Sequence, residues 1–372
     1  MEKLSTQKEV RIISIAVVAG TRPEIIKMAP ILRALEKQKV PFTFIHTGQH
    51  YDYNMSLQFI KELALPKPDH SFKLISTTPA SQIGEMMTKL DRVLQNHKTR
   101  LLLIQGDTNT MLASALTGVK LALKIGHVEA GLRSYDWRMP EEHNRRMVDH
   151  ISNFLFAPTK RNKQNLIEEH VYGRIYVTGN TIMDAIVQHM SLAEKRSRIM
   201  QSINFNEYLL ATIHRAENVD DPKTLKNLME TFIDSPIPVV FPAHPRTVKN
   251  LRRLRLFDKL KGSSNLKLLP PLGYFDFLLL MKYCKVILTD SGGIQEESTS
   301  PYIRKPVLVL RLSTERPEAV ETGFAKVVGT NKSKILKALN KFLNQPPNLP
   351  IQSPFGDGKT SQKIARIIVE TI

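Results

Sequence analysis

Strand-length apolar runs alternate with helix-length amphipathic segments along almost the whole chain. The runs in the first half are mostly apolar on both sides, which is typical of strands in a parallel sheet covered on both faces. Parallel neighbours need a crossover connection that is usually a helix, so this alternation predicts the α/β class. The strands expected in the first half are residues 12–19, 42–46, 101–105, 124–128, 154–157 and 175–177.

The same pattern starts again in the second half. Strands are expected at residues 208–213, 238–241, 266–269, 286–289, 306–310 and 325–328. A chain of 372 residues exceeds what one core usually serves, so the sequence predicts two similar α/β domains that face a central cleft. We expect residues 1–183 and 184–357 to form them, with a C-terminal helix in residues 358–372 that packs back on the first domain.

Charge and composition limit the functional class. The formal net charge of +18 is compatible with nucleic-acid binding, but Lys and Arg are spread along the chain without a dense basic block. A positive field equally suits a small anionic substrate. One cysteine, Cys284, excludes an internal disulfide. With no signal-peptide or membrane-length apolar run, we expect a cytoplasmic protein with no membrane or nucleic-acid partner.

A short glycine-containing run in the second half indicates a phosphate site. The apolar residues 286–289 lead into Asp-Ser-Gly-Gly-Ile-Gln-Glu-Glu at residues 290–297. This pattern predicts a strand that turns into a helix N-terminus, where free N–H groups and the helix dipole suit a phosphate. On its own the run fits an ordinary strand–turn–helix equally well.

Polar clusters follow nearly all of the other strands, where ligands gather in parallel sheets. The first half contributes three carboxylates in such clusters: Asp107, Glu129 and Glu141. Arg22, Lys27 and Arg316 are cations able to bind a diphosphate. No glycine motif for NAD, no P-loop, no zinc-binding histidine spacing and no Gly-x-Ser-x-Gly elbow occurs, so neither a cofactor nor a metal is expected.

Together these motifs resemble the non-hydrolysing UDP-N-acetylglucosamine 2-epimerases, which have two Rossmann-like α/β/α domains of the GT-B fold. The resemblance extends from residue 20 to about residue 329, with the motifs in family order. They are Gly-Thr-Arg-Pro-Glu-Ile-Ile-Lys, Gln-Gly-Asp-Thr, His-Val-Glu-Ala-Gly-Leu-Arg, Pro-Glu-Glu-x-Asn-Arg, Thr-x-His-Arg-x-Glu-Asn, Asp-Ser-Gly-Gly-Ile-Gln-Glu-Glu and Thr-Glu-Arg-Pro-Glu.

The resemblance implies an isomerase that interconverts UDP-N-acetylglucosamine and UDP-N-acetylmannosamine for surface polysaccharide or glycan synthesis. A base removes the C2 proton while the C1–O bond to UDP breaks, and UDP then adds back to 2-acetamidoglucal with a proton on the opposite face. This route needs acid/base groups on both faces of the ring and stabilisation of the leaving diphosphate. The family habit also implies a homodimer.

The resemblance also assigns roles to residues, without deciding which carboxylate removes the proton and which returns it. The catalytic residues that it implies are Asp107, Glu129, Glu141 and His214. The substrate and UDP contacts that it implies are Arg22, Lys27, His214, Phe277, Ser291, Gly292, Gly293, Glu297 and Arg316. A regulatory second substrate site, found in some bacterial members, would use His50, Arg215 and His244.

Simpler structural roles compete for several of these residues. Asp107 could cap a helix beginning at Thr108, and Glu129 could pair with Arg133. Because Glu141 and Glu142 are adjacent, we expect one to be structural and take Glu141 as catalytic. His214 and Arg215 could be a packed pair, and Pro245 suggests that His244 lies in a turn.

Three other functions compete with the isomerase. A hydrolysing relative would release the sugar and UDP, and a GT-B glycosyltransferase would need an acceptor site. A basic nucleic-acid-binding protein would leave the carboxylates unexplained. The family often has Asp-Thr where this chain has Leu312-Ser313, which puts sugar preference and activation in question.

Overall fold

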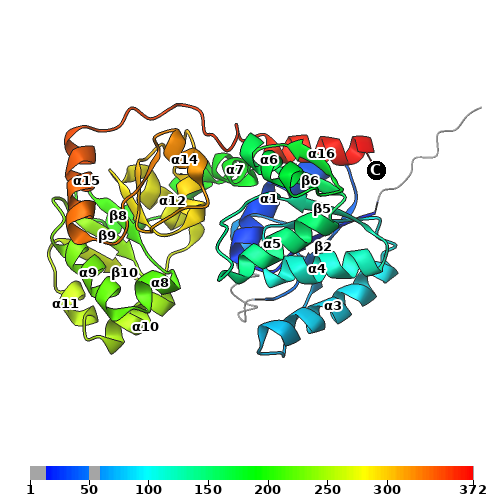
Figure 1. Ribbon diagram of the computed structural model, residues 1–372, viewed down its shortest axis with the longest axis horizontal. Coiled ribbons are helices and arrows are strands. Elements are labelled where there is room, and N and C mark those ends of the chain that lie inside the picture. The colour runs from blue at the N-terminus through cyan, green and yellow to red at the C-terminus, as the bar shows by residue number, and fades with distance from the viewer. Residues whose placement is uncertain (1–13, 50–58, 372) are drawn as a thin grey trace, which may run out of the picture. The chain divides into compact units, whose positions relative to one another are not determined.

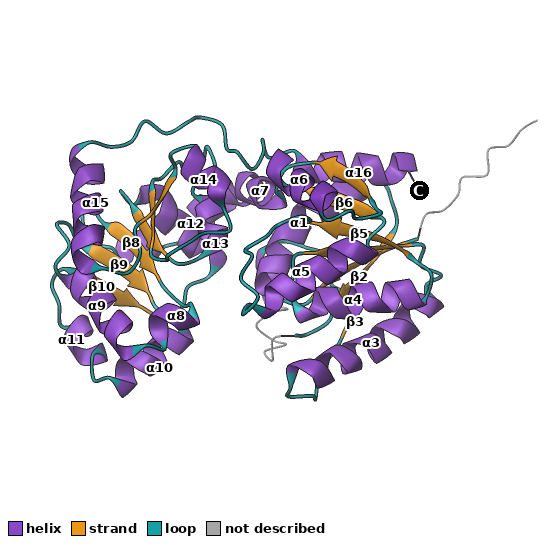
Figure 2. Ribbon diagram, viewed as in Figure 1, coloured by secondary structure: helices purple, strands orange, loops and turns teal. Residues whose placement is uncertain are grey.

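The computed structural model describes residues 14–49 and 59–371, which divide into two compact units (Figure 1). The first unit comprises residues 1–181 and 359–372, and the second comprises residues 182–358. Helices pack on both faces of a central sheet in each unit (Figure 2). The expected α/β class with two Rossmann-like units is therefore confirmed.

The described residues of the first unit contain a seven-stranded sheet in the order β3-β2-β1-β4-β5-β6-β7, with every neighbouring pair parallel. Its strands are β1 Ile15–Ala19, β2 Phe42–His46, β3 His70–Ser71, β4 Leu101–Gln105, β5 Lys124–Val128, β6 Phe154–Ala157 and β7 Arg174–Val177. Its helices are α1 Arg22–Lys37, α3 Pro79–Asn96, α4 Asn109–Lys120, α5 Pro140–Ile151, α6 Lys160–Glu168 and α16 Thr360–Thr371.

Alternate side chains of the central strands form the core of the first unit. Ala16 and Val18 of β1 and Leu102 and Ile104 of β4 pack against buried residues of α3, α4 and α5. On α16, Ile364 and two further apolar residues are buried where the helix packs against α1. The first unit therefore needs the end of the chain to complete its packing.

In the second unit the described residues form a six-stranded parallel sheet in the order β10-β9-β8-β11-β12-β13. Its strands are β8 Leu209–Thr212, β9 Val239–Pro242, β10 Leu266–Leu269, β11 Ile287–Thr289, β12 Val307–Val309 and β13 Ala325–Val327. Its α-helices are α7 Thr181–Arg196, α8 Ala216–Val219, α9 Pro222–Ile233, α10 Pro245–Arg253, α11 Phe257–Lys261, α12 Tyr274–Tyr283, α13 Gly292–Glu297, α14 Pro317–Glu321 and α15 Lys332–Asn344. Helix α7 begins one residue before the unit, and a 3-10 helix, η1 Ile199–Ser202, follows it.

The sheet of the second unit packs on an apolar layer of its own. Residues of β8, β9, β11 and β12 pack there with buried side chains of α9 and α15. Cys284 lies in the interior and is fully buried. Burial raises the pKa of its thiol to about 12, so it stays protonated at neutral pH.

Most expected strands occur within one to three residues of their predicted bounds. The first starts at Ile15 rather than at residue 12, and residues 12 and 13 lie outside the described part of the chain. The short strand β3 was not expected. Pro30 lies inside α1, which nevertheless continues to Lys37. In residues 14–49 and 59–371, every helix is too short or too polar to reach across a bilayer.

Candidate active site

Each sheet reverses its strand order at one point, and the predicted site residues follow the strands on either side of it. In the first unit the reversal lies between β1 and β4, which lead into Arg22 and Asp107. In the second unit it lies between β8 and β11, which lead into His214 and Ser291. Ligands of open α/β sheets bind at such switch points, at the carboxyl ends of the strands.

Glu24 fixes the start of α1 at the switch point of the first unit. Its carboxylate accepts the backbone N–H groups of Gly20 and Thr21 at 2.6 and 3.0 Å, in a capping box. It also accepts the hydroxyl of Thr108 at 2.5 Å, just after β4. Burial raises the pKa of Glu24 to about 7, against the opposing effect of these hydrogen bonds. The Glu24 carboxyl thus connects the loop after β1 to the loop after β4.

Glu129 receives two donors from neighbouring elements. The Lys27 ammonium lies 2.5 Å from its Oε2, and the Gln105 side-chain amide donates to the same oxygen at 2.5 Å. The Lys27 and Glu129 side chains are only 12% and 5% exposed, so this ion pair is largely removed from water. A structural pair between Glu129 and Arg133 was the alternative expected from the sequence. Arg133 instead forms ion pairs with Asp149 and Glu169.

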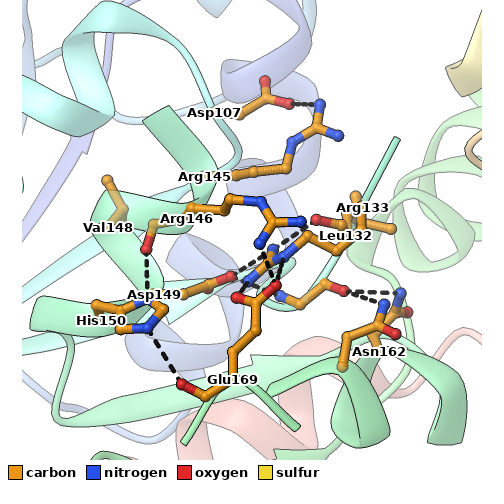
Figure 3. Close-up of polar contacts among 12 residues, drawn as sticks. Asp107, Leu132, Arg133, Arg145, Arg146, Val148, Asp149, His150, Asn162 and Glu169 are labelled. Atoms are coloured by element: carbon orange, nitrogen blue, oxygen red, sulfur yellow. Dashed lines mark hydrogen bonds and ion pairs between the residues drawn. The ribbon is translucent and has the colours of Figure 1, made fainter. Parts of the chain in front are cut away.

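Asp107 lies in the loop between β4 and α4 and is held by α5. Its carboxylate pairs with Arg145 at 2.5 Å (Figure 3). Its carbonyl accepts the Asn144 side-chain amide at 2.9 Å. Thr108, not Asp107, is the N-cap residue of α4. The Asp107 side chain is 29% exposed, so it remains accessible to a ligand.

The two adjacent glutamates of α5 have different environments. Glu142 is fully buried and accepts the backbone N–H and hydroxyl of Ser134 at 2.9 and 2.8 Å, and it also pairs with Arg145 and Arg146. Although burial opposes it, these donors lower the pKa of Glu142. Glu141 lies in the first turn of α5 and is exposed. The structural member of the pair is therefore Glu142.

In the second unit, Asp290 organises the turn that carries His214. Its buried carboxylate accepts the backbone N–H groups of His214 at 3.1 Å and of Arg215 at 3.0 Å, and the Asn218 amide at 3.0 Å. The His214 ring lies 3.6 Å from the same carboxylate. Burial lowers the pKa of His214, a shift that Asp290 opposes and Arg215 reinforces. The His214 imidazole is therefore neutral at neutral pH.

His244 and Arg215, predicted as regulatory residues, lie close to His214. The rings of His214 and His244 are 5.7 Å apart between centroids. His244 is the exposed N-cap residue of α10 and accepts the Arg246 backbone N–H at 3.2 Å. Arg215 pairs with Glu315 at 3.4 Å. The third predicted member, His50, lies outside the described residues.

The predicted phosphate cradle is the start of α13. Ser291 is its N-cap residue, and Gly292 and Gly293 form its first turn, where backbone N–H groups have no acceptor within the helix. A Cβ on Gly292 would lie 3.5 Å from Glu315 Oε2 and 3.7 Å from Arg316 Cζ. A Cβ on Gly292 would therefore only be in van der Waals contact with Glu315 and Arg316, and the Arg316 guanidinium pairs with Glu296.

Glu315 gathers the cations around this cradle. It lies within 2.7 Å of Arg311 and 3.4 Å of Arg215. Burial would raise the pKa of Glu315, but Arg316, Arg311 and Arg215 outweigh burial and lower it to about 2. The carboxylate stays ionised at neutral pH and forms ion pairs with two guanidinium groups, those of Arg311 and Arg215.

The remaining predicted contacts lie on two helices of the second unit. Phe277 is half-buried in the first turn of α12, and Glu297 ends α13. Within residues 14–49 and 59–371, no group of three or more His, Cys, Asp or Glu side chains is placed to hold a metal ion.

Sequence reasoning missed several residues that build the site. Glu24 had a usable signal, because Thr-x-x-Glu ahead of an apolar run is the capping-box pattern. Asp290 was singled out only as part of a motif, although it positions His214. Arg145 and Glu315 also occur only as members of quoted motifs, which do not show that Arg145 pairs with Asp107 or that Glu315 pairs with Arg311 and Arg215.

Comparisons with known proteins agree with this arrangement. Residues 33–369 match the family model for UDP-N-acetylglucosamine 2-epimerase. The chain is 45% identical to the UDP-N-acetylglucosamine 2-epimerase of Methanocaldococcus jannaschii over 95% of this chain and 98% of that protein. It is 34% identical to the UDP-2,3-diacetamido-2,3-dideoxy-D-glucuronate 2-epimerase of Pseudomonas aeruginosa over 96% and 99% of the two chains.

Solved structures give the same result in three dimensions. The M. jannaschii UDP-GlcNAc 2-epimerase, crystallised in complex with UDP-GlcNAc and UDP, superposes with a TM-score of 0.88 at 45% identity, covering 96% of this chain and all of that one. With matched motifs at the switch points of both sheets and near-complete coverage, the chain belongs to the UDP-N-acetylglucosamine 2-epimerase family.

Proposed function

We propose that this protein catalyses the reversible C2 epimerisation of UDP-N-acetylglucosamine to UDP-N-acetylmannosamine. The observation that carries this proposal is the near-complete match to the M. jannaschii epimerase, whose crystal structure contains UDP-GlcNAc and UDP. The placement of polar clusters at both switch points supports it, because elimination requires both a proton acceptor and diphosphate stabilisation.

The reaction proceeds by elimination and re-addition. A carboxylate takes the C2 proton, the C2–H electron pair forms the C1–C2 double bond, and the C1–O bond breaks to release UDP. UDP then attacks C1 of the resulting 2-acetamidoglucal while an acid delivers a proton to the opposite face of C2. Atoms and charge balance without an oxidant, and water must stay out while the intermediate is present.

Asp107, Glu129 and Glu141 are the acid/base groups of this proposal, and they belong to the first unit. The Lys27 ammonium stabilises negative charge on Glu129, as Arg145 does on Asp107.

The second unit binds the nucleotide in this proposal. Ser291, Gly292 and Gly293 present the start of α13 to the diphosphate, and Arg316 supplies positive charge beside Gly292. Arg22 and Lys27 add cations from the first unit, and His214 assists at the nucleotide. Glu297 binds the ribose and Phe277 packs near the uracil.

The test is incubation of the purified protein with UDP-GlcNAc in deuterated water, followed by proton NMR. We expect UDP-ManNAc with deuterium at C2 and little free UDP. Free UDP with released sugar would instead support the hydrolysing alternative. No change with UDP-GlcNAc, together with turnover of a UDP-2,3-diacetamido-glucuronate, would replace the proposed substrate by that of the P. aeruginosa relative.

Three further expectations belong to the same proposal. Residues 1–183 with 358–372, and residues 184–357, act as its functional domains, and the protein works as a homodimer. His50, Arg215 and His244 form a second substrate site. Sigmoidal dependence of the forward rate on UDP-GlcNAc, converted to a hyperbola in an Arg215→Ala variant, would support that site, whereas a hyperbolic wild type would contradict it.

A further inference from the structure

The buried carboxylate of Asp149 is connected to the segments that carry the candidate catalytic groups of the first unit. It is on α5 and is completely inaccessible to solvent. Its Oδ1 contacts the His127 ring at 2.7 Å, and its Oδ2 accepts the Gly131 backbone N–H at 3.1 Å and Arg133 at 2.8 Å. Burial of an ionised carboxylate costs free energy unless it is paired and hydrogen-bonded. The three donors therefore offset the cost of burying Asp149.

His127 connects Asp149 to the loop that carries Asp107. The His127 ring is fully buried, and its Nε2 lies 2.8 Å from the Gly106 carbonyl oxygen, one residue before Asp107. Both ring nitrogens therefore face groups that only accept hydrogen bonds. Asp149 thus holds the ring that fixes the Gly106 carbonyl.

A second bond connects Asp149 to the segment that carries Glu129. Gly131 follows Glu129 by two residues, and both have left-handed backbone conformations, with φ of +82° and +70°. A left-handed glutamate is strained and persists only where its surroundings fix it. The bond from the Gly131 N–H to Asp149 supplies such a restraint at the end of β5.

The third connection is the helix itself. Glu141 lies in the first turn of α5, and Asp149 lies on the same helix about two turns later. Figure 3 shows Asp149 close to Arg133, Arg146 and Glu169 in this part of the first unit. From these contacts we infer that Asp149 is a positioning residue that sets the relative places of Asp107, Glu129 and Glu141.

The electrostatics agree with a permanently ionised Asp149. Burial would raise its pKa, but the hydrogen bond and charge of His127, together with Arg133, lower the pKa below its ordinary value. Arg133 is in turn paired with Glu169 at 2.6 Å. Replacement of Asp149 by Asn would keep the volume but turn an amide NH₂ toward at least one of three donors.

This inference rests on the proposed function, and its experiment compares two variants with a matched control. Asp149→Asn removes the central acceptor, and His127→Gln removes the ring that reaches Gly106. Glu169→Gln removes a carboxylate from the same ion-pair cluster without touching His127 or Gly131. For each protein, kcat and KM for UDP-GlcNAc and the thermal midpoint are measured.

We expect Asp149→Asn and His127→Gln to lower kcat roughly 100-fold, since displacement of about 1 Å costs that much. KM should change less than about threefold, because nucleotide contacts are untouched. Glu169→Gln should lose stability yet keep kcat. If Asp149→Asn does not fold at the assay temperature, His127→Gln decides, since it leaves Asp149 bonded to Arg133 and Gly131.

Folded variants with normal kcat would overturn the inference, as would an equal loss in Glu169→Gln. A rise in KM that accounts for the whole effect would also overturn it, because it would place the defect in binding. Failure of the proposed function is recognised separately, since the wild-type protein would then leave UDP-GlcNAc unchanged.

Discussion

Glu129 shows how single residues at this site depart from ordinary backbone preferences. Its φ of +70° lies in the left-handed region, which non-glycine residues rarely adopt and which costs on the order of 1–3 kcal/mol. The conformation places its carboxylate within reach of Lys27 and Gln105. Strain at a carboxylate on the ligand-binding edge of a sheet is consistent with a catalytic group held in position.

Glu129→Gln should therefore abolish most turnover while leaving the fold intact. The amide is nearly isosteric but cannot take a proton, and loss of a general acid/base group typically costs a factor of roughly 10² to 10⁴ in kcat. The turnover rate is measured as deuterium incorporation at C2 of UDP-GlcNAc, followed by NMR. The control is Glu168→Gln, an exposed α6 residue, and equal rates in the two variants would remove Glu129 from the mechanism.

Glu315→Gln tests the cation cluster through its pH dependence. The folded pKa of Glu315, about 2, lies below its ordinary 4.5, so the carboxylate stabilises the fold above pH 4.5 by on the order of 3 kcal/mol. That contribution disappears as the pH falls toward 2. In urea unfolding, the wild-type advantage over Glu315→Gln should be full at neutral pH and shrink in acid. A pH-independent difference would contradict the ion pairing.

Local sequence patterns identified the strand-end motifs but not the pairs that these residues form. Lys27 and Glu129 are 102 positions apart, and Asp107 and Arg145 are 38 apart. Such ion pairs depend on which strands become neighbours, and no periodicity encodes that. The sequence alone could therefore indicate the chemistry of Glu129 but not the partner that stabilises its charge.

At the scale of elements, the tight turn after β5 depends on glycine. Gly131 has φ +82°, and a Cβ there would meet the Asn162 carbonyl oxygen at 2.3 Å. Gly84, inside α3, has no heavy atom within 4 Å of an added Cβ. The backbone conformation and the space at Gly131 therefore require a glycine, whereas the space around Gly84 would accept a side chain.

Alanine substitution at Gly131 and at Gly84 should change the free energy of unfolding in opposite directions. Gly131→Ala should lower the free energy of unfolding by at least about 1–3 kcal/mol, from strain and the clash. Gly84→Ala should raise it by about 0.5–1 kcal/mol, because alanine is the better helix former. Chemical denaturation measures both values. Equal effects of the same sign would show that the turn tolerates a side chain.

Element bounds were predictable where apolar runs are long and failed where packing decides. β2, β4, β5, β6 and β10 agree with their expected bounds. The two-residue strand β3 could not be predicted, because His70 and Ser71 have no strand propensity of note and pair with β2 only through the register of the sheet. Short strands of this kind depend on tertiary context.

At the scale of the whole molecule, α16 is the part of the first unit most distant from the rest in sequence. Its Ile368 is buried, whereas the adjacent Val369 is 44% exposed. Ile368→Ala should lower the stability of the first unit by about 2–5 kcal/mol, and Val369→Ala by no more than about 0.5 kcal/mol. Calorimetry resolves the loss. An unchanged thermal transition in Ile368→Ala would mean that α16 contributes little.

The return of the chain to its first unit sets an order for folding during synthesis. Residues 182–358 form a continuous unit, so they can fold once they have left the ribosome. The first unit, although its sheet is translated earlier, lacks α16 until residues 360–371 have been made. Helix α1 therefore lacks its α16 packing partner while the second unit is being made. The unit whose synthesis begins first is thus completed only after the second unit has been translated.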